Sequence, residues 1–267
     1  MDMYFAVLNF ALAGVIGIVG ILTLRKVSIP HEVVFASLPL LFALHQLTEG
    51  FVWLGVDGVI GSRALEMAET LFIYYAQGVL PFLVPLAIWL IEKNSFKRQL
   101  VGILVILGFG LMVYTLYGLA TLPSSVRVVN DTLNYSNPWT ANYYDALIYV
   151  LTTCGSLMLS SSISIQLFGF FNLIGLIIIA LLRPYGFTSV WCLYAATISG
   201  LLYFYFVERR IKFLQDLKKE RAELSDEILA KQEALSGALL EKKDELSAHL
   251  ETELDALSKR KLFTKKA

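Results

Sequence analysis

Long apolar stretches separated by short polar segments make up the first 207 residues. The hydrocarbon core of a bilayer holds no water to pair with backbone groups, so a crossing segment forms a helix of roughly 20 apolar residues. The pattern predicts an all-α, polytopic membrane protein with about seven transmembrane helices. These predicted spans lie at residues 4–24, 33–55, 65–91, 100–122, 143–161, 165–182 and 188–207.

The pattern changes after residue 207, where charged residues replace the apolar runs. Residues 208–267 hold 27 of the 44 Lys, Arg, Asp and Glu residues of the chain. From residue 224 the sequence consists of four 11-residue blocks, and each block begins with Leu-Ser. The leading leucines are Leu224, Leu235, Leu246 and Leu257. Eleven residues complete three helical turns, so these leucines form a nearly straight or right-handed stripe on one long helix.

A narrow apolar stripe on an otherwise polar helix needs a partner surface. We predict that the helix self-associates through residues 224–257 into an oligomeric coiled coil. The alternative is an amphipathic helix lying on the membrane surface. The polar face is mixed in sign and not basic, which favours the coiled coil.

The two patterns divide the chain into a transmembrane domain at 1–207 and a cytoplasmic helix at 208–267, with the repeats at 224–267. Orientation follows from loop basicity, because Lys and Arg stay on the cytoplasmic side. With the N-terminus outside, the basic residues on the inner side are Arg25, Lys26, Lys93, Lys97, Arg98, Arg209, Arg210 and Lys212. The outer loops hold only Arg63, Arg127 and Arg183. The longest loop, 123–142, is then external and either folds over the outer mouth or lies at the headgroup level.

The sequence excludes several function classes. The seventh predicted span contains no lysine for a retinal Schiff base, and only His45 lies within a span, whereas zinc-dependent lipid hydrolases need several histidines. Cys154 and Cys192 fall inside apolar runs, as small buried residues do. The chain has no Walker loop, GxGxxG, HExxH or nucleophile elbow. We expect no enzymatic activity, no cofactor, no metal and no nucleic-acid partner.

The second predicted span carries the first candidate site residues. His45 and Glu49 lie four residues apart on one helical face that continues to Trp53, with Gln46 beside them. Ionisable residues within a span are costly to insert and are therefore functional candidates. The alternative is that these residues form hydrogen bonds that hold two helices together.

Further candidates lie at the same predicted level, in the outer half of the membrane. These are Glu66, Glu69 and Gln77 in the third span, Asp145 at the start of the fifth and Trp191 in the seventh. Several carboxylates at one level would share protons or hold a cation, and aromatic rings beside them would suit an organic cation. The alternative is that Glu66, Glu69 and Asp145 are simply solvated at the interface.

Two stretches are similar to a known family. Residues 35–42 (FASLPLLF) run into Gln46, Glu49, Gly50 and Trp53, and residues 189–196 read SVWCLYAA. Together they resemble a family of uncharacterised bacterial multi-span integral membrane proteins, a domain of unknown function, over roughly residues 10–207. The resemblance implies a bacterial inner-membrane setting and marks Gln46, Glu49, Trp53 and Trp191 as the positions to test.

These features favour a homo-oligomeric channel or carrier for a cation or proton. Its predicted partners are the lipid bilayer and other copies of the chain, with the tail free to take a cytoplasmic partner. The alternative is a membrane sensor or scaffold that binds a small ligand and signals through its cytoplasmic helix. An intramembrane enzyme acting on lipid ranks last because no complete catalytic constellation is present.

Overall fold

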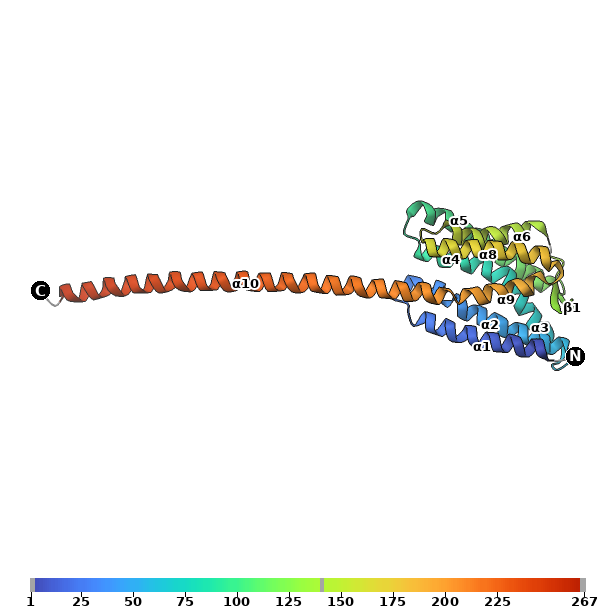
Figure 1. Cartoon of the computed structure of the whole chain (residues 1–267). Helices are drawn as coiled ribbons and strands as arrows, with labels where there is room; N and C mark the ends of the chain where they lie inside the picture. Colours follow the sequence, from blue (N-terminus) through green and yellow to red (C-terminus); the bar gives the residue numbers. More distant parts are fainter. Residues whose placement is uncertain (1–2, 140–141, 265–267) are drawn as a thin grey trace. The chain divides into compact units, whose positions relative to one another are not determined.

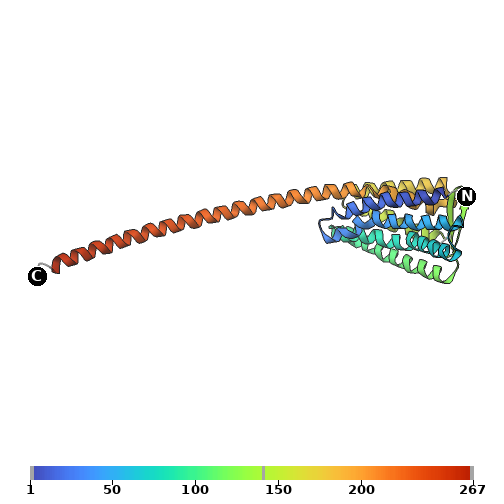
Figure 2. The ribbon, with the colours of Figure 1, turned by 90° about the horizontal axis from the view of Figure 1, so that it is seen from below.

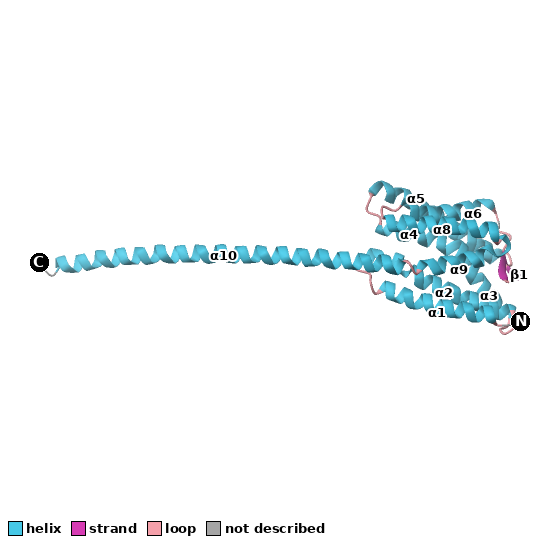
Figure 3. Cartoon of the chain, in the orientation of Figure 1, coloured by secondary structure: helices cyan, strands magenta, loops and turns pink. Residues whose placement is uncertain are grey.

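The computed structural model describes residues 3–139 and 142–264, and helices dominate this part of the chain (Figure 3). It forms two compact units, the bundle (Met1–Arg210) and the tail (Ile211–Ala267). The α-helices are α1 (Tyr4–Leu24), α2 (Val33–Val56), α3 (Ser62–Ile73), α4 (Leu80–Ile91), α5 (Ser95–Thr121), α6 (Tyr143–Val150), α7 (Ser156–Leu159), α8 (Ile163–Leu182), α9 (Phe187–Ser199) and α10 (Leu202–Thr264). Two π-helical segments are η2 (Tyr74–Val79) and η3 (Leu151–Gly155), and two 3-10 turns are η1 (Pro30–Glu32) and η4 (Pro184–Gly186). The strands are β1 (Ser125–Val129) and β2 (Thr132–Ser136).

Among the described residues, six helices are long and apolar enough to cross a membrane, which is compatible with a multi-pass membrane protein. They are Tyr4–Leu24, Pro30–Val56, Ser62–Ile91, Ser95–Thr121, Ile163–Leu182 and Phe187–Leu254. The fifth predicted span, 143–161, is shorter in the structure, where α6, η3 and α7 hold 8, 5 and 4 residues. Such a segment is about 26 Å long, against a hydrocarbon core of about 30 Å. The count of seven spans therefore stays a prediction.

The helices of the bundle lie side by side and alternate in direction (Figures 1 and 2). The β1–β2 hairpin lies at the end of the bundle where α1 begins (Figure 1). We call this end the hairpin end, the adjoining half the hairpin half, and the other end the opposite end. Because consecutive helices reverse direction, α3, α6 and α9 also begin at the hairpin end. Residues from distant parts of the chain are thereby brought to one level.

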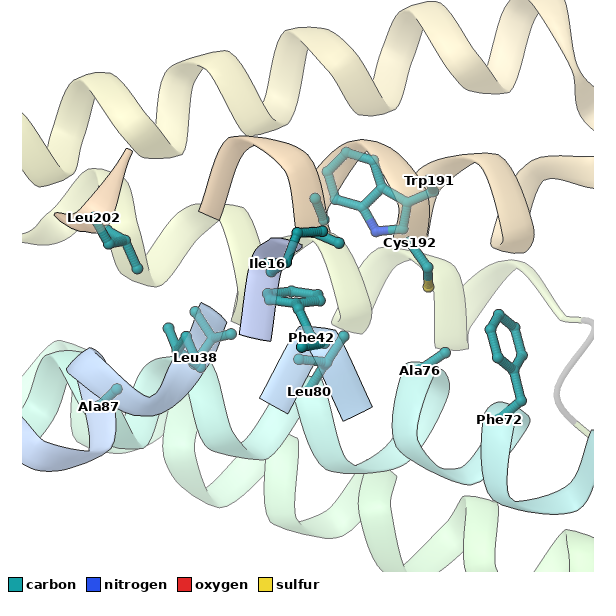
Figure 4. Packing of buried hydrophobic residues seen from close by; sticks show 14 of the residues in the cluster. Ile16, Leu38, Phe42, Phe72, Ala76, Leu80, Ala87, Trp191, Cys192 and Leu202 are labelled. Atoms are coloured by element: carbon teal, nitrogen blue, oxygen red, sulfur yellow. The ribbon is translucent and has the colours of Figure 1, made fainter. Parts of the chain in front are cut away.

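Buried apolar side chains from several helices form the core of the bundle. Figure 4 shows Phe42 of α2, Leu80 of α4 and Cys192 of α9 among them. Large apolar side chains also cover the outside, for example Val15 on α1 and Ile106 on α5, which are 62% and 72% exposed. Apolar side chains on all sides of a helix suit a membrane environment.

Two glycines allow helices of the bundle to approach closely. A Cβ atom added at Gly20 of α1 would lie 2.5 Å from the backbone nitrogen of Leu40 on α2. A Cβ at Gly108 of α5 would collide with the carbonyl oxygen of Pro81 on α4. Small residues at such contacts are typical of helix packing in membranes.

Two buried carboxylates connect segments at the opposite end. Glu32 of η1 pairs with the guanidinium of Arg209 on α10. Glu92, after α4, accepts hydrogen bonds from the Asn94 N–H at 2.9 Å, the Ser161 hydroxyl at 2.7 Å and the Ser161 N–H at 2.7 Å. Burial alone would raise the pKa of Glu92, but these three donors and the nearby Lys97 ammonium hold it below its ordinary value. Glu92 therefore stays charged, and the two carboxylates join segments that are distant in sequence.

The external loop predicted at 123–142 contains a β-hairpin that the sequence analysis did not foresee. β1 and β2 pair antiparallel, with Val129 opposite Thr132. The two turn residues, Asn130 and Asp131, have φ angles of 50° and 60°, as the central residues of a two-residue hairpin turn require. Leu133 on β2 is fully buried, so the hairpin packs into the end of the bundle.

The tail continues α10, which is helical to Thr264; residues 265–267 of the predicted repeat lie outside the described residues. Three of its repeat leucines are exposed, with Leu224 at 57%, Leu235 at 64% and Leu246 at 63%. Lys231 and Glu227 form an i,i+4 ion pair at 2.6 Å on the polar face. The predicted long helix is present, and its apolar stripe is uncovered in the single chain.

Candidate binding site in the bundle

The four candidate residues of α2 are all buried, but they contact different neighbouring helices. Gln46 donates a hydrogen bond to Asn9 of α1 at 3.4 Å, and the ring of Trp53 stacks on Phe5 of α1 at 4.6 Å. His45 and Glu49 contact other helices instead. Gln46 and Trp53 thus join α2 to α1, whereas His45 and Glu49 lie between α2 and the rest of the bundle.

Glu49 is a carboxyl group almost without access to solvent. It is 1% exposed, and its Oε1 accepts a short hydrogen bond from the hydroxyl of Ser189 on α9. Within residues 3–139 and 142–264, no basic side chain pairs with it. A buried carboxylate is costly unless a proton or a cation shares its charge. Glu49 is therefore suited to exchanging one or the other.

His45 lies beside Glu49 on α2, between aromatic rings. Its ring centroid is 4.1 Å from that of Phe72 on α3 and 4.6 Å from that of Tyr75 in η2. Neither ring nitrogen has a hydrogen-bond partner among the described residues. Unpaired buried nitrogens are uncommon in folded proteins, so the two nitrogens of His45 are available to an incoming group.

Tyr135 extends this aromatic stack from the hairpin. Its ring centroid lies 4.2 Å from that of Phe72, so Phe72 stacks with both His45 and Tyr135. Its buried hydroxyl has no partner in the described part of the chain. Burial, with the nearby Glu49, Cys192 and Glu69, raises the pKa of Tyr135 well above its ordinary value, so the hydroxyl keeps its proton.

A cavity of about 360 Å³ lies in the bundle between η2, α5, α6, α8 and α9. Its aromatic wall includes Tyr149, Phe187 and Trp191, and the Trp191 indole N–H donates to the Tyr149 hydroxyl at 2.8 Å. Its polar wall includes Gln77 and Asp145. The cavity combines flat aromatic faces with a carboxylate and an amide.

Two polar atoms on this cavity lack partners among the described residues. They are the Oε1 atom of Gln77 and the hydroxyl oxygen of Thr115. Asp145, by contrast, accepts a hydrogen bond from the Asn142 amide at 2.7 Å. A solute in the cavity would find one carboxylate and two unpaired acceptor oxygens.

The π-helical segments lie next to this cavity. Gln77 belongs to η2, and Tyr149 immediately precedes the last residue of α6 before η3. Pro81 follows η2 closely and cannot donate a backbone hydrogen bond. Single-turn π-helices inside α-helices often mark functional sites. Here η2 places Gln77 on the cavity wall, and η3 begins directly after Val150, which also lines the cavity.

The two remaining glutamates lie at the hairpin end and have different surroundings. Glu66 is exposed. Glu69 is buried and accepts a hydrogen bond from the hydroxyl of Ser124, just before β1, at 3.1 Å. Glu69 therefore joins α3 to the hairpin, whereas Glu66 faces the surroundings.

A model of a family of unknown function, DUF6629, matches residues 3–216. The chain belongs to this family. The match covers almost all of the bundle and ends near the start of the tail, which confirms the resemblance to an uncharacterised family. Neither the comparison with curated proteins nor that with solved structures gives a match.

The structure places Gln46 and Trp53 against α1 and leaves Glu66 exposed. The other six predicted site residues lie in three places, of which we call the first, around His45 and Glu49, the core cluster. His45 and Glu49 lie in the core cluster, Gln77, Asp145 and Trp191 line the cavity, and Glu69 contacts the hairpin. The segment η2 connects the first two places, since Tyr75 contacts His45 and the next two residues, Ala76 and Gln77, line the cavity. Across the described residues, no group of three or more His, Cys, Asp or Glu side chains is placed to hold a metal ion.

Sequence reasoning missed two residues of the core cluster, Ser189 and Tyr135. Ser189 lies 140 positions from Glu49, and a single sequence contains no signal for that pairing. Tyr135 had a signal, because Leu133 and Tyr135 alternate with polar residues after Asn130-Asp131, as in a strand after a turn.

Proposed function

We propose that the bundle is a membrane carrier or channel for a proton or a small cation, with Glu49 at its central site. One observation carries this proposal: Glu49 is fully buried, with a neutral hydroxyl as its hydrogen-bond partner. Beside it, His45 offers two unpaired ring nitrogens. A carboxyl and an imidazole in such surroundings can pass a proton or hold a cation transiently.

The cavity supplies a place where a cation would wait before it reaches Glu49. Aromatic faces attract cations through their ring quadrupoles, and Trp191 and Tyr149 provide such faces. Asp145 would supply the opposite charge, and Gln77 Oε1 would accept a hydrogen bond from an ammonium group. These features favour an organic cation over a bare metal ion.

For the setting, we propose seven spans in a bacterial inner membrane, with the N-terminus outside and the C-terminus in the cytoplasm. The short helix from α6 to α7 would be the fifth span, and its length would be met by local thinning of the bilayer. The basic residues near the opposite end support this orientation. The hairpin would then cover the outer mouth.

Flux measurements in proteoliposomes test the proposal. The full-length chain should move protons, or one member of a panel of inorganic and organic cations, down an imposed gradient. Glu49→Gln removes the titratable charge at nearly constant shape and should lower this flux by about 100-fold. Glu66→Gln is the matched control, because it removes an exposed carboxylate from the same half and should leave flux unchanged. Wild-type vesicles that pass none of these ions would contradict the proposal.

We propose that the tail holds several copies of the chain together. The exposed leucines of the repeats would be covered by the same leucines of neighbouring copies, in a parallel bundle that is straight or right-handed. Replacing Leu235 and Leu246 with serine should reduce the mass of the detergent-solubilised assembly to that of a single chain. Serine at the exposed polar positions Gln232 and Lys243 serves as control. An unchanged mass in the leucine variant would contradict this assignment.

A ligand sensor is the second candidate, and one feature of α9 favours it. This helix lines the cavity with Trp191, gives Ser189 to Glu49, and is followed after two residues by α10. A ligand that displaced α9 would act directly on the helix that continues into the tail. Removing residues 224–267 separates the candidates, since a carrier keeps flux per chain whereas a sensor loses its cytoplasmic output.

A further inference from the structure

A second cavity, of about 350 Å³, lies at the opposite end of the bundle, away from Glu49. Four basic side chains line it, together with Glu92 and three apolar residues. The basic residues are His31, Lys93, Arg98 and Arg209, and the apolar residues are Ile29, Leu90 and Ile91. None of them belongs to the site proposed for cation transport.

Three of the basic groups have different surroundings. The guanidinium of Arg98 lies 4.4 Å from the ring centroid of Trp89, so it stacks on an aromatic face with its N–H groups at the edge. The guanidinium of Arg209 is held by Glu32. Lys93 is exposed and has no ion-pair partner in the described residues.

The one acidic residue of the wall, Glu92, is already satisfied. Both of its carboxylate oxygens accept hydrogen bonds, from Asn94 and from Ser161. The Lys97 ammonium lies close enough to stabilise its charge. The cationic side chains in and beside the cavity are Lys93, Lys97, Arg98 and Arg209, and the carboxylates are Glu32 and Glu92. Cationic groups therefore outnumber carboxylates, so the cavity favours an anion.

We propose that this cavity binds an anionic phosphate group. Arg98 presents a planar fork of donors that matches phosphate oxygens, and Lys93 adds a mobile point charge. The apolar wall formed by Ile29, Leu90 and Ile91 suits the glycerol and upper acyl carbons of an anionic phospholipid. Basic pockets between membrane helices bind such headgroups. A soluble phosphate compound would present the same anion without the apolar part.

The test uses the full-length chain in detergent, titrated separately with phosphatidylglycerol, phosphatidylcholine and inorganic phosphate. Bound lipid is counted by native mass spectrometry, and binding of each compound is followed by thermal stabilisation. The variant Lys93→Gln/Arg98→Gln removes the lysine and the arginine of the wall that pair with no carboxylate among the described residues. It should weaken phosphatidylglycerol binding by about 30-fold. Arg63→Gln/Arg127→Gln makes the same change in charge at the hairpin end and should leave the affinity unchanged.

Arg98→Lys keeps the charge but removes the fork, so it should give an intermediate loss while the chain stays folded. If phosphatidylglycerol binds and inorganic phosphate neither stabilises the chain nor competes, the ligand is a lipid headgroup. If inorganic phosphate stabilises the wild type and not the double variant, the ligand is a soluble phosphate. Equal binding of phosphatidylcholine, an equal loss in the control variant, or no binding of any compound would overturn the proposal.

Discussion

Buried carboxylates in the two halves of the bundle have different partners. At the opposite end, Glu32 pairs with Arg209, and Glu92 accepts three hydrogen bonds beside Lys97. In the hairpin half, Glu49 is as deeply buried but accepts from the hydroxyl of Ser189. The first two groups have the donors that a permanent charge needs. Glu49 does not, which is the arrangement expected of a group that gains and loses its charge.

Unpaired polar atoms follow the same division. Among the described residues, the buried side-chain atoms without a partner include both nitrogens of His45 and oxygens of Gln77, Thr115 and Tyr135. These residues lie in the hairpin half or near the middle of the bundle, and Ser28 is the exception at the opposite end. Under the proposed function, the comparison separates carboxylates that stabilise the fold from groups that would bind a proton or a cation.

The largest stability effect should come from Arg209→Met. This change leaves the buried Glu32 carboxylate without its cationic partner, so we expect a loss of about 3 kcal/mol in the free energy of unfolding. Thermal unfolding of the full-length chain in detergent, followed by tryptophan fluorescence, would measure it. Arg25→Met, at an exposed position of the same end, should cost less than about 0.5 kcal/mol. Equal stability of the two variants would show that the pair between Glu32 and Arg209 does not stabilise the fold.

Glu92→Ala should cost about 2 kcal/mol, because it leaves the N–H groups of Asn94 and Ser161 without their acceptor. Ser161→Ala removes only the hydroxyl hydrogen bond and should cost about 1 kcal/mol. The same unfolding measurement ranks the two variants. A cost for Glu92→Ala no greater than that for Ser161→Ala would show that the backbone donors do not depend on Glu92.

His45→Phe should have the opposite sign and stabilise the bundle by about 1 kcal/mol. Phenylalanine can keep the stack with Phe72 and Tyr75 while it removes two unpaired buried nitrogens. Flux in proteoliposomes should fall in the same variant. His249→Phe, on the exposed tail, should change neither quantity. If His45→Phe strongly destabilised the bundle, the imidazole of His45 would be needed for the fold, which would contradict this prediction.

The smallest effect is a pH dependence at Glu92. Its pKa in the folded chain lies below the ordinary value of 4.5, so its stabilising contribution is complete above that value and is lost as the pH falls through the folded pKa. The difference in melting temperature between the wild type and Glu92→Gln should therefore shrink as the pH falls below 4.5. A difference that grew on acidification would contradict the assigned direction.

Hydropathy predicted most of the helices because six of them are long and apolar enough to cross a membrane. The length of the segment at 143–161 was harder to predict. Its helix contains the π-helical segment η3 and ends at Leu159, before Ser160. The hairpin was read only as a polar loop, although Asn130-Asp131 is a turn signal. His45 and Glu49 could be recognised in the sequence because they are ionisable residues inside an apolar run. The partners that distinguish Glu49 from Glu92 were not visible, because Ser189 and Ser161 are brought to them only by tertiary packing.

The most direct test of the division between the two halves compares flux and stability in Glu49→Gln and Glu92→Gln. Both variants replace a buried carboxyl by an amide of the same shape, in the same reconstituted full-length chain. We predict that Glu49→Gln unfolds like the wild type and loses flux, whereas Glu92→Gln is less stable and keeps its flux per folded chain. Wild-type flux in Glu49→Gln, or a loss of flux explained entirely by unfolded protein, would contradict the account.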